Sequence, residues 1–357
     1  MNRTMNEDEK YMTRCLQLAR CGQSHAAPNP MVGAVIVADG RIIGEGYHIR
    51  CGEAHAEVNA VNSVQPKDKP LLAQASIYVS LEPCSHYGKT PPCADLIIAC
   101  GIPRVVVGCV DPFSEVAGRG IRKLRDAGID VTVGVLEQEC LALNNRFIVN
   151  HTERRPYIIL KWAQSADGFI DRLRTSPEER PVTFSNNHTT MLVHRQRAGV
   201  QAIMVGKRTA WLDNPSLTVR HWPGESPLRV VIDRHLELPT TLHLFDGSVP
   251  TLVFTACTEV PAIEGVEYAT IDYSQPTLPQ MLAELYHRRI QSLLVEGGTT
   301  LLQSFIDANL WDEAHVETAP ITLEEGVKAP VLPDGLPKET TQIGTHRKEI
   351  YQPKKTT

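Results

Sequence analysis

The chain has 357 residues, a length that suggests two domains. Hydrophobic residues make up 42% and charged residues 22% of it, as in ordinary globular proteins. Its 36 Lys and Arg against 41 Asp and Glu give a net charge of −5, which excludes a general basic surface for nucleic acid. The polar start has no signal-peptide pattern, and no apolar run approaches the ~18 residues of a membrane span. We therefore expect a cytoplasmic protein with neither nucleic acid nor membrane as a partner.

Helices and strands alternate along the first 150 residues. Asn6 caps a predicted helix over 6–21, which Gly22 ends. Asp39-Gly40 is the turn of a predicted β-hairpin. Periodicity predicts the remaining elements, with strands at 32–37, 41–46, 77–81, 105–110 and 129–133 and helices at 55–62, 92–100 and 117–127. This order indicates an α/β domain whose later strands run parallel.

The polar segment 150–156 ends in proline, and we interpret it as the domain boundary, which gives domains 1–150 and 151–357. The alternation then restarts. Strands are expected at 157–162, 202–205, 229–232, 251–255, 292–295 and 314–317, and helices at 188–198, 282–288 and 299–309. The tail after Pro333 is polar and rich in lysine, so we expect it to be frayed.

One imidazole and two thiols in the first half form a candidate metal site. They belong to His55-Ala56-Glu57, Pro83-Cys84 and Cys93. Three protein ligands leave the fourth position of a zinc ion open, as in catalytic sites. Glu57, beside the first ligand, is placed to move protons, and this pattern is typical of zinc-dependent nucleobase deaminases. His86 competes as a ligand on spacing alone, although an isolated histidine is usually not a ligand.

A Gly-Gly pair in the second half stands between a predicted strand and a predicted helix. In Glu296-Gly297-Gly298 the backbone amides and the helix N-terminus are suited to a phosphate. The alternative is a simple tight turn. No Gly-x-Gly-x-x-Gly follows a strand, so the standard dinucleotide fingerprint is absent from the sequence.

The spacing of the two cysteines carries a family resemblance. Eight residues, 85–92, separate them, where ordinary cytidine and tRNA-adenosine deaminases have two. With the motifs at 28–33, 44–48, 111–120, 161–168 and 213–220, the chain resembles the RibD family of bifunctional riboflavin-biosynthesis proteins over nearly its whole length. The resemblance implies an α/β fold, with an N-terminal cytidine-deaminase-like three-layer domain and a C-terminal dihydrofolate-reductase-like domain.

The same resemblance implies roles for residues of the first domain. His55, Cys84 and Cys93 would bind Zn2+, and Glu57 would be the proton shuttle. Three further residues would meet the substrate: Asn29 as a hydrogen-bond partner of the pyrimidine, with His48 and Lys89 lining the pocket.

In the second domain the resemblance implies an NADPH site and a substrate site. The cofactor contacts would be Lys161, Ser165, Asp167, Thr209, Asp213, Gly297 and Gly298, and the substrate contacts Arg197, Leu217, Arg220 and Glu296. The two arginines suit a phosphate, because a guanidinium makes two parallel hydrogen bonds to it. The charged segment 172–186 departs from the family pattern, and no site residue is assigned there.

The resemblance implies two successive reactions on phosphorylated pyrimidines. The first is the zinc-dependent hydrolytic deamination of 2,5-diamino-6-(5-phosphoribosylamino)pyrimidin-4(3H)-one. The second is the NADPH-dependent reduction of the ribosyl side chain of 5-amino-6-(5-phosphoribosylamino)uracil to ribityl. It also implies a homo-oligomer, either a dimer or a tetramer. The alternatives are a monofunctional deaminase with a binding or oligomerising second domain, a non-catalytic zinc module, and a tRNA-editing deaminase, against which the acidic charge argues.

Overall fold

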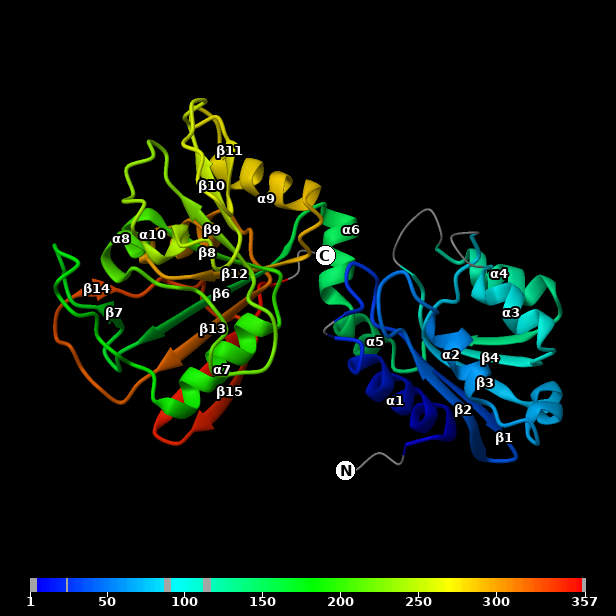
Figure 1. Ribbon diagram of the computed structural model, residues 1–357. Helices are drawn as coiled ribbons and strands as arrows, with labels where there is room; N and C mark the ends of the chain where they lie inside the picture. The colour runs from blue at the N-terminus through cyan, green and yellow to red at the C-terminus, as the bar shows by residue number, and fades with distance from the viewer. Residues whose placement is uncertain (1–4, 24, 87–90, 112–116, 355–357) are drawn as a thin grey trace. The chain divides into compact units, whose positions relative to one another are not determined.

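The computed structural model describes residues 5–23, 25–86, 91–111 and 117–354. The chain divides into two compact units, Met1–Arg154 and Arg155–Thr357 (Figure 1). The predicted boundary segment 150–156 is not a simple linker, because its first residues belong to helix α6 (Asn145–Glu153). Among the described residues, no helix has both the length and the apolar character needed to cross a membrane.

The first unit is built on a five-stranded sheet in the order β2-β1-β3-β4-β5. Strand β1 runs antiparallel to β2 and β3, whereas β3, β4 and β5 are mutually parallel, as predicted for the later strands. The strands are β1 (Gly33–Ala38), β2 (Arg41–Tyr47), β3 (Ser76–Leu81), β4 (Arg104–Cys109) and β5 (Asp130–Val133). The carboxyl ends of β3 and β4 therefore meet at one edge of the sheet.

Helices cover both faces of this sheet. Val105 and Val107 face one hydrophobic core with α2 (Ala56–Ser63), α3 (Cys93–Ala99) and α4 (Arg119–Asp126). Val106 faces the other core, with α1 (Glu7–Arg20) and α5 (Glu137–Leu143). The predicted Asn6 cap is present, with a reciprocal bond from Glu9. A 3-10 helix, η1 (Lys69–Gln74), precedes β3. The unit therefore has three layers, because alternate strand residues point to opposite faces.

The second unit contains a nine-stranded sheet in the order β11-β10-β9-β8-β12-β6-β13-β16-β15. The strands from β11 to β13 are parallel, and β16 and β15 complete the sheet antiparallel. They are β6 (Tyr157–Gln164), β8 (Ala202–Gly206), β9 (Leu228–Ile232), β10 (Thr251–Thr255), β11 (Val266–Thr270), β12 (Ser292–Glu296), β13 (Glu313–Thr318), β15 (Lys338–Ile343) and β16 (His346–Tyr351). A separate small ladder pairs β7 (Phe169–Asp171) with β14 (Val327–Lys328).

Helices lie on both faces of this sheet as well. Ile158, Leu160 and Trp162 of β6 pack in a core with α9 (Thr277–His287) and α10 (Thr299–Asp307). The intervening residue Lys161 points to the opposite face, over which α7 (Asn187–Ala198) lies. Helix α8 (Lys207–Asp213) follows β8, and a 3-10 turn, η2 (His243–Phe245), precedes β10. The carboxyl ends of the parallel strands thus face the loops that carry the predicted reductase residues.

The expectation of a frayed tail after Pro333 is wrong. Residues 338–351 form the hairpin β15–β16, and β16 pairs along its length with β13. The sequence of β16 is charged, so its composition resembles that of a disordered end. Its order comes from backbone hydrogen bonds to a strand that lies nearly thirty residues earlier in the chain, which local composition does not reveal.

Candidate active sites

Three ligand atoms converge where α2 and α3 begin. His55 is the N-cap residue of α2, and Cys93 is the first residue of α3. His55 Nδ1 lies 3.5 Å from Cys84 Sγ and 3.4 Å from Cys93 Sγ. Ordinary zinc bond lengths at a tetrahedral angle place N and S about 3.6 Å apart. The three side chains therefore fit a zinc ion without rearrangement.

The surroundings of the cysteines favour a thiolate. The backbone N–H of Cys93 donates to Cys84 Sγ at 3.2 Å. The hydrogen bond from the Cys93 thiol, opposed by burial and assisted by His55, lowers the pKa of Cys84 to about 4. The same hydrogen bond raises the pKa of Cys93, since one proton is shared between two sulfurs. Metal binding would displace that remaining proton.

Glu57 lies on the first turn of α2 and is only 3% exposed. Burial raises its pKa to about 7, and its carboxyl group hydrogen-bonds with Cys93. A carboxyl group with a pKa near neutrality can both accept and return a proton under physiological conditions. The position and the protonation chemistry of Glu57 both suit a proton shuttle beside the metal ligands.

Asn29 and His48 lie together beside His55. Asn29 Nδ2 donates to His48 Nε2 at 3.0 Å, and His48 Nδ1 donates to the carbonyl of Ala54 at 3.1 Å. The His48 ring meets the His55 ring edge-on at 5.5 Å, and burial lowers the pKa of His48. A neutral His48 therefore orients the amide of Asn29.

Two other residues considered from the sequence do not join this group. Lys89 lies outside the described residues. Within the described part of the chain, the group of possible metal ligands consists of His55, Cys84 and Cys93, and His86 is not one of them. His86 instead lines a shallow hollow with Glu82 and Asp111.

Glu82 is a supporting residue that the sequence analysis missed. Its buried carboxylate accepts hydrogen bonds from four backbone amides, at 2.8–3.2 Å, which belong to Asp111, Gly118, Gly120 and Ile121. These bonds hold the start of α4 against the loop that carries Cys84. A signal was present in the sequence, because the acidic Glu82 directly follows the predicted strand 77–81 and directly precedes Pro83-Cys84.

We expect Glu82→Gln to destabilise the first unit by about 1–3 kcal/mol, because its amide NH2 group would face backbone donors. The measurement is the free energy of unfolding in urea, with the exposed Glu139→Gln as the matched control. Equal stability of the two variants would contradict this role of Glu82.

The Gly-Gly pair of the second unit fits closely against α8. Gly297 has φ +92°, and a Cβ atom there would lie 2.6 Å from Thr209 Cγ2. Gly298 is the N-cap of α10, and a Cβ atom there would lie 3.1 Å from Thr209 Oγ1. A side chain at either position would therefore force Thr209 or the turn to shift, by more at Gly297 than at Gly298. The turn brings three predicted cofactor contacts together at a helix N-terminus, which fits a phosphate of a dinucleotide.

Ser165 and Asp167 shape the loop after β6. Ser165 is fully buried, and its Oγ accepts from Phe169 N at 2.9 Å. The carboxylate of Asp167 accepts from the backbone amides of Leu323 and Glu324, at 3.1 and 2.8 Å. The hydrogen bond from Ser165, with those amides, lowers the pKa of Asp167. In this structure these two predicted cofactor residues serve to hold neighbouring loops.

Arg174, in the segment left unassigned, holds Asp213. Its guanidinium is 4% exposed, bonds Asp171 Oδ2 at 2.6 Å, and also pairs with Asp213 Oδ1. It donates to the carbonyl of Leu212 as well. The unusually charged segment is therefore anchored to the end of α8 beside the predicted cofactor site.

The four predicted substrate residues lie near the last turn of α7. Arg197 makes two hydrogen bonds to Glu296, at 3.1 and 2.7 Å, and a third to the carbonyl of Thr218. Although burial acts in the opposite direction, Arg197 lowers the pKa of Glu296. Leu217 is buried with φ +54°, and the exposed Arg220 follows it. Because Arg197 is engaged with Glu296, Arg220 is the arginine of this group that faces solvent.

His194 is the second residue that the sequence analysis missed. Its Nδ1 accepts a hydrogen bond from the backbone N–H of Arg220 at 3.0 Å. Burial, with the charges of Arg197 and Arg220, lowers the pKa of His194 to about 4. The ring therefore stays neutral and able to accept this bond. No local motif marks His194, since its partner is 26 residues away.

Each of the two units matches a known protein family. The family described as cytidine and deoxycytidylate deaminase zinc-binding region matches residues 5–109, and the RibD C-terminal domain matches 156–351. The riboflavin biosynthesis protein RibD of Bacillus amyloliquefaciens is 40% identical over 338 residues, which cover 92% of this chain and 88% of that protein.

Two solved structures have the same fold over 98% of this chain. A diaminohydroxyphosphoribosylaminopyrimidine deaminase/5-amino-6-(5-phosphoribosylamino)uracil reductase from Thermotoga maritima has a TM-score of 0.87 at 35% identity, covering 98% of this chain and 100% of that one. Acinetobacter baumannii RibD has a TM-score of 0.83 at 31% identity, covering 98% and 99%.

These matches confirm the predicted fold classes and the two cofactors, Zn2+ and NADPH. They favour the bifunctional interpretation over a monofunctional deaminase, because the reductase half is matched as fully as the deaminase half. The chain belongs to the RibD family of riboflavin-biosynthesis enzymes, in which a deaminase domain is joined to a reductase domain.

Proposed function

We propose that domain 1–150 deaminates 2,5-diamino-6-(5-phosphoribosylamino)pyrimidin-4(3H)-one and that domain 151–357 reduces the resulting phosphoribosylaminouracil. The observation that carries the first assignment is the buried Glu57 beside a triangle of three zinc-ligand atoms. The second rests on the glycine turn against Thr209, next to the Arg197–Glu296 pair. Membership of the family supports the order of the two steps.

In the deaminase, each residue has a distinct task. His55, Cys84 and Cys93 would hold the zinc ion, which would supply the activation of a water molecule for attack on the ring carbon that carries the amino group. Glu57 would take one proton from the attacking water and pass it to the ring nitrogen, and would then take the proton of the new hydroxyl group and pass it to the amino group, which departs as ammonia. Asn29 donates an amide hydrogen bond to His48. This bond fixes the amide so that Oδ1 of Asn29 would accept a hydrogen bond from a pyrimidine N–H.

In the reductase, the chain positions cofactor and substrate. When bound, NADPH would supply the hydride, and a proton from water would complete the two-electron reduction of the opened ribosyl side chain to ribityl. The Gly297 and Gly298 backbone receives a cofactor phosphate, with Thr209 and Asp213 beside it. Arg220 binds the substrate phosphate, and Arg197 keeps Glu296 ionised next to the reacting ribosyl group.

The direct test is a two-step assay on the zinc-loaded full chain. Ammonia release should occur with the diamino substrate in the absence of NADPH. Loss of NADPH absorbance should require the deaminated intermediate. If that intermediate causes no oxidation of NADPH, the monofunctional alternative replaces the proposal.

We expect His194→Leu to raise the KM of the reductase for its substrate roughly fivefold to a hundredfold, because the partly buried backbone N–H of Arg220 loses its acceptor. His194→Asn keeps an acceptor oxygen near the position of Nδ1 and should stay close to wild type. The KM for NADPH should not change in either variant. Equal substrate KM values for the two variants would show that His194 does not position Arg220.

The resemblance also leads us to propose a cytoplasmic homo-oligomer, either a dimer or a tetramer. Light scattering on the eluting peak of a sizing column measures the mass directly. A mass equal to one chain of 39.5 kDa would contradict the oligomer.

A further inference from the structure

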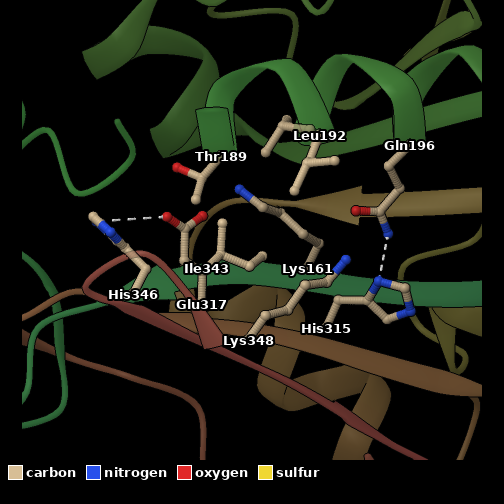
Figure 2. Close-up of a pocket in the computed structure, with 10 residues that line it drawn as sticks. Lys161, Thr189, Leu192, Gln196, His315, Glu317, Ile343, His346 and Lys348 are labelled. Carbon is tan, nitrogen blue, oxygen red and sulfur yellow. Dashed lines mark hydrogen bonds and ion pairs between the residues drawn. The ribbon is translucent and has the colours of Figure 1, made fainter. Parts of the chain in front are cut away.

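A small hollow lies under α7 in the second unit, on the sheet face formed by β6, β13 and β16. Figure 2 shows its lining, with side chains rising from the strands toward the helix. Its cavity volume is about 20 Å³, which leaves room for about one water molecule. The hollow therefore acts through the side chains that line it and not through a ligand inside it. These side chains are Lys161, Thr189, Leu192, Val193, Gln196, His315, Glu317, Ile343, His346 and Lys348.

Lys161 connects this hollow with the proposed reductase site. Its backbone on β6 is in register with Glu296 of β12 on one side and with His315 of β13 on the other. Although burial acts in the opposite direction, Arg197 and then Lys161 lower the pKa of Glu296. Lys161 is also one of the residues predicted to contact NADPH. The position of its ammonium group therefore bears on the binding of the cofactor.

A second lysine, Lys348 of β16, extends into the same hollow (Figure 2). Burial, followed by the nearby charge of Lys161, lowers the pKa of Lys348. Within the described residues, neither ammonium group has a hydrogen bond or an ion pair. Two half-buried like charges repel each other more strongly than they would in water. Lys348 therefore opposes a movement of Lys161 deeper into the hollow.

Glu317 presents an unpartnered carboxylate oxygen to the hollow. The residue is 6% exposed, and its Oε2 accepts from Ser185 Oγ at 3.0 Å. Among the described residues, its buried Oε1 has no hydrogen-bond partner. A buried carboxylate oxygen without a donor costs stability. Glu317 therefore attracts an ammonium group, and both lysines line the same space.

The histidines of the lining do not supply a charge to Glu317. His346 Nε2 lies 3.9 Å from Glu317 Oε1 but donates to the carbonyl of Phe184 at 2.9 Å. Its Nδ1 accepts from Asn186 at 3.0 Å. The second histidine, His315, is hydrogen-bonded at both nitrogens as well. Each ring uses one donor and one acceptor, as a neutral imidazole does, so the two lysines are the cations of this hollow.

We propose that the side chain of Lys161 has two positions, one turned inward to pair with Glu317 and one turned outward to NADPH, and that Lys348 favours the outward one. The inward ion pair would satisfy Glu317, but it would also confine two ammonium groups to a space the size of one water molecule. The inference rests on the proposed reductase function. It makes Glu317 and Lys348 positioning residues for the cofactor, with opposite effects on its affinity.

The test is fluorescence titration of the zinc-loaded full chain with NADPH at neutral pH. Lys348→Met should weaken binding about threefold or more, because Lys161 then pairs with Glu317. Glu317→Gln should strengthen binding by a similar factor, because the inward position loses its charged partner. Lys348→Arg should bind like wild type, as should Lys354→Met, which replaces an exposed lysine just after β16. Changes in the same direction for Lys348→Met and Glu317→Gln, or no change in either, would overturn the inference.

A second background separates this effect from the general influence of charge on an anionic cofactor. In Lys161→Met, the effects of Lys348→Met and Glu317→Gln should both disappear, because they act through the Lys161 ammonium group. Effects that persist in that background would overturn the inference. If the wild-type chain binds and oxidises NADPH but Lys161→Met binds it equally well, the inference fails while the proposed reductase function holds. Thermal unfolding of each variant establishes that the second unit is folded.

Discussion

Replacement of Glu57 by Gln is expected to slow deamination by about 10²- to 10⁴-fold, while zinc stays bound and the reductase stays active. Glutamine keeps the size of the side chain but cannot take a proton from water. The ligands His55, Cys84 and Cys93 are untouched, so metal content should match wild type. The reductase half is a separate compact unit, so its turnover of the deaminated intermediate should be unchanged.

The measurements are ammonia release, zinc content by atomic absorption, and NADPH oxidation with the deaminated intermediate. Glu53→Gln, an exposed carboxylate in the loop before α2, is the matched control and should deaminate normally. Normal deamination by Glu57→Gln would remove the proton shuttle from the mechanism. Loss of zinc together with activity would instead mean that the variant disturbs the ligands.

The second large effect is expected from Gly297→Ala, which should weaken NADPH binding about tenfold to a thousandfold. The left-handed backbone at φ +92° costs an alanine about 1–2 kcal/mol, and the contact of its Cβ with Thr209 adds about 1–3 kcal/mol. The turn must shift to relieve this contact. Since its amides face the proposed cofactor phosphate, the shift should lower the affinity for NADPH more than the stability of the unit.

Fluorescence titration with NADPH measures this affinity without depending on turnover. Gly344→Ala is the matched control, because it also has a positive φ but no atom within 4 Å of the added Cβ. Gly344→Ala therefore has only the unfavourable positive φ and no steric contact, and it should bind NADPH normally. If Gly297→Ala also binds normally, the glycine turn is not part of the cofactor site. Deamination should be unaffected in both variants.

The zinc site was predictable because its residues lie in short local motifs. His55 and Glu57 share one turn of α2, and Cys93 opens α3, so the helix starts place the ligands. The unbroken apolar run Val105–Val107 also predicts a buried strand directly from the sequence, and its side chains enter both cores. In these places local chemistry and tertiary packing require the same residues.

The supporting residues were not predictable, because each depends on a partner far away in the chain. Glu82 binds amides near residue 120, and His194 binds the amide of Arg220. Arg174 stands in a charged segment that resembles a solvated loop, yet it is buried against Asp213. A charged residue is buried only when an oppositely charged or hydrogen-bonding group lies next to it, and the sequence does not show which distant residue provides that group.

The sequence by itself therefore determined the fold class, the family to which both domains belong, and the group formed by His55, Cys84 and Cys93 with Glu57 on the first turn of α2. Only the tertiary structure decided that the charged end of the chain is strand β16, and that Lys348 on it reaches the space beneath α7. The physical reason is that metal chemistry and strand periodicity depend on residues close together in the chain. Burial of charge depends on which distant backbone and side-chain groups the fold brings to it.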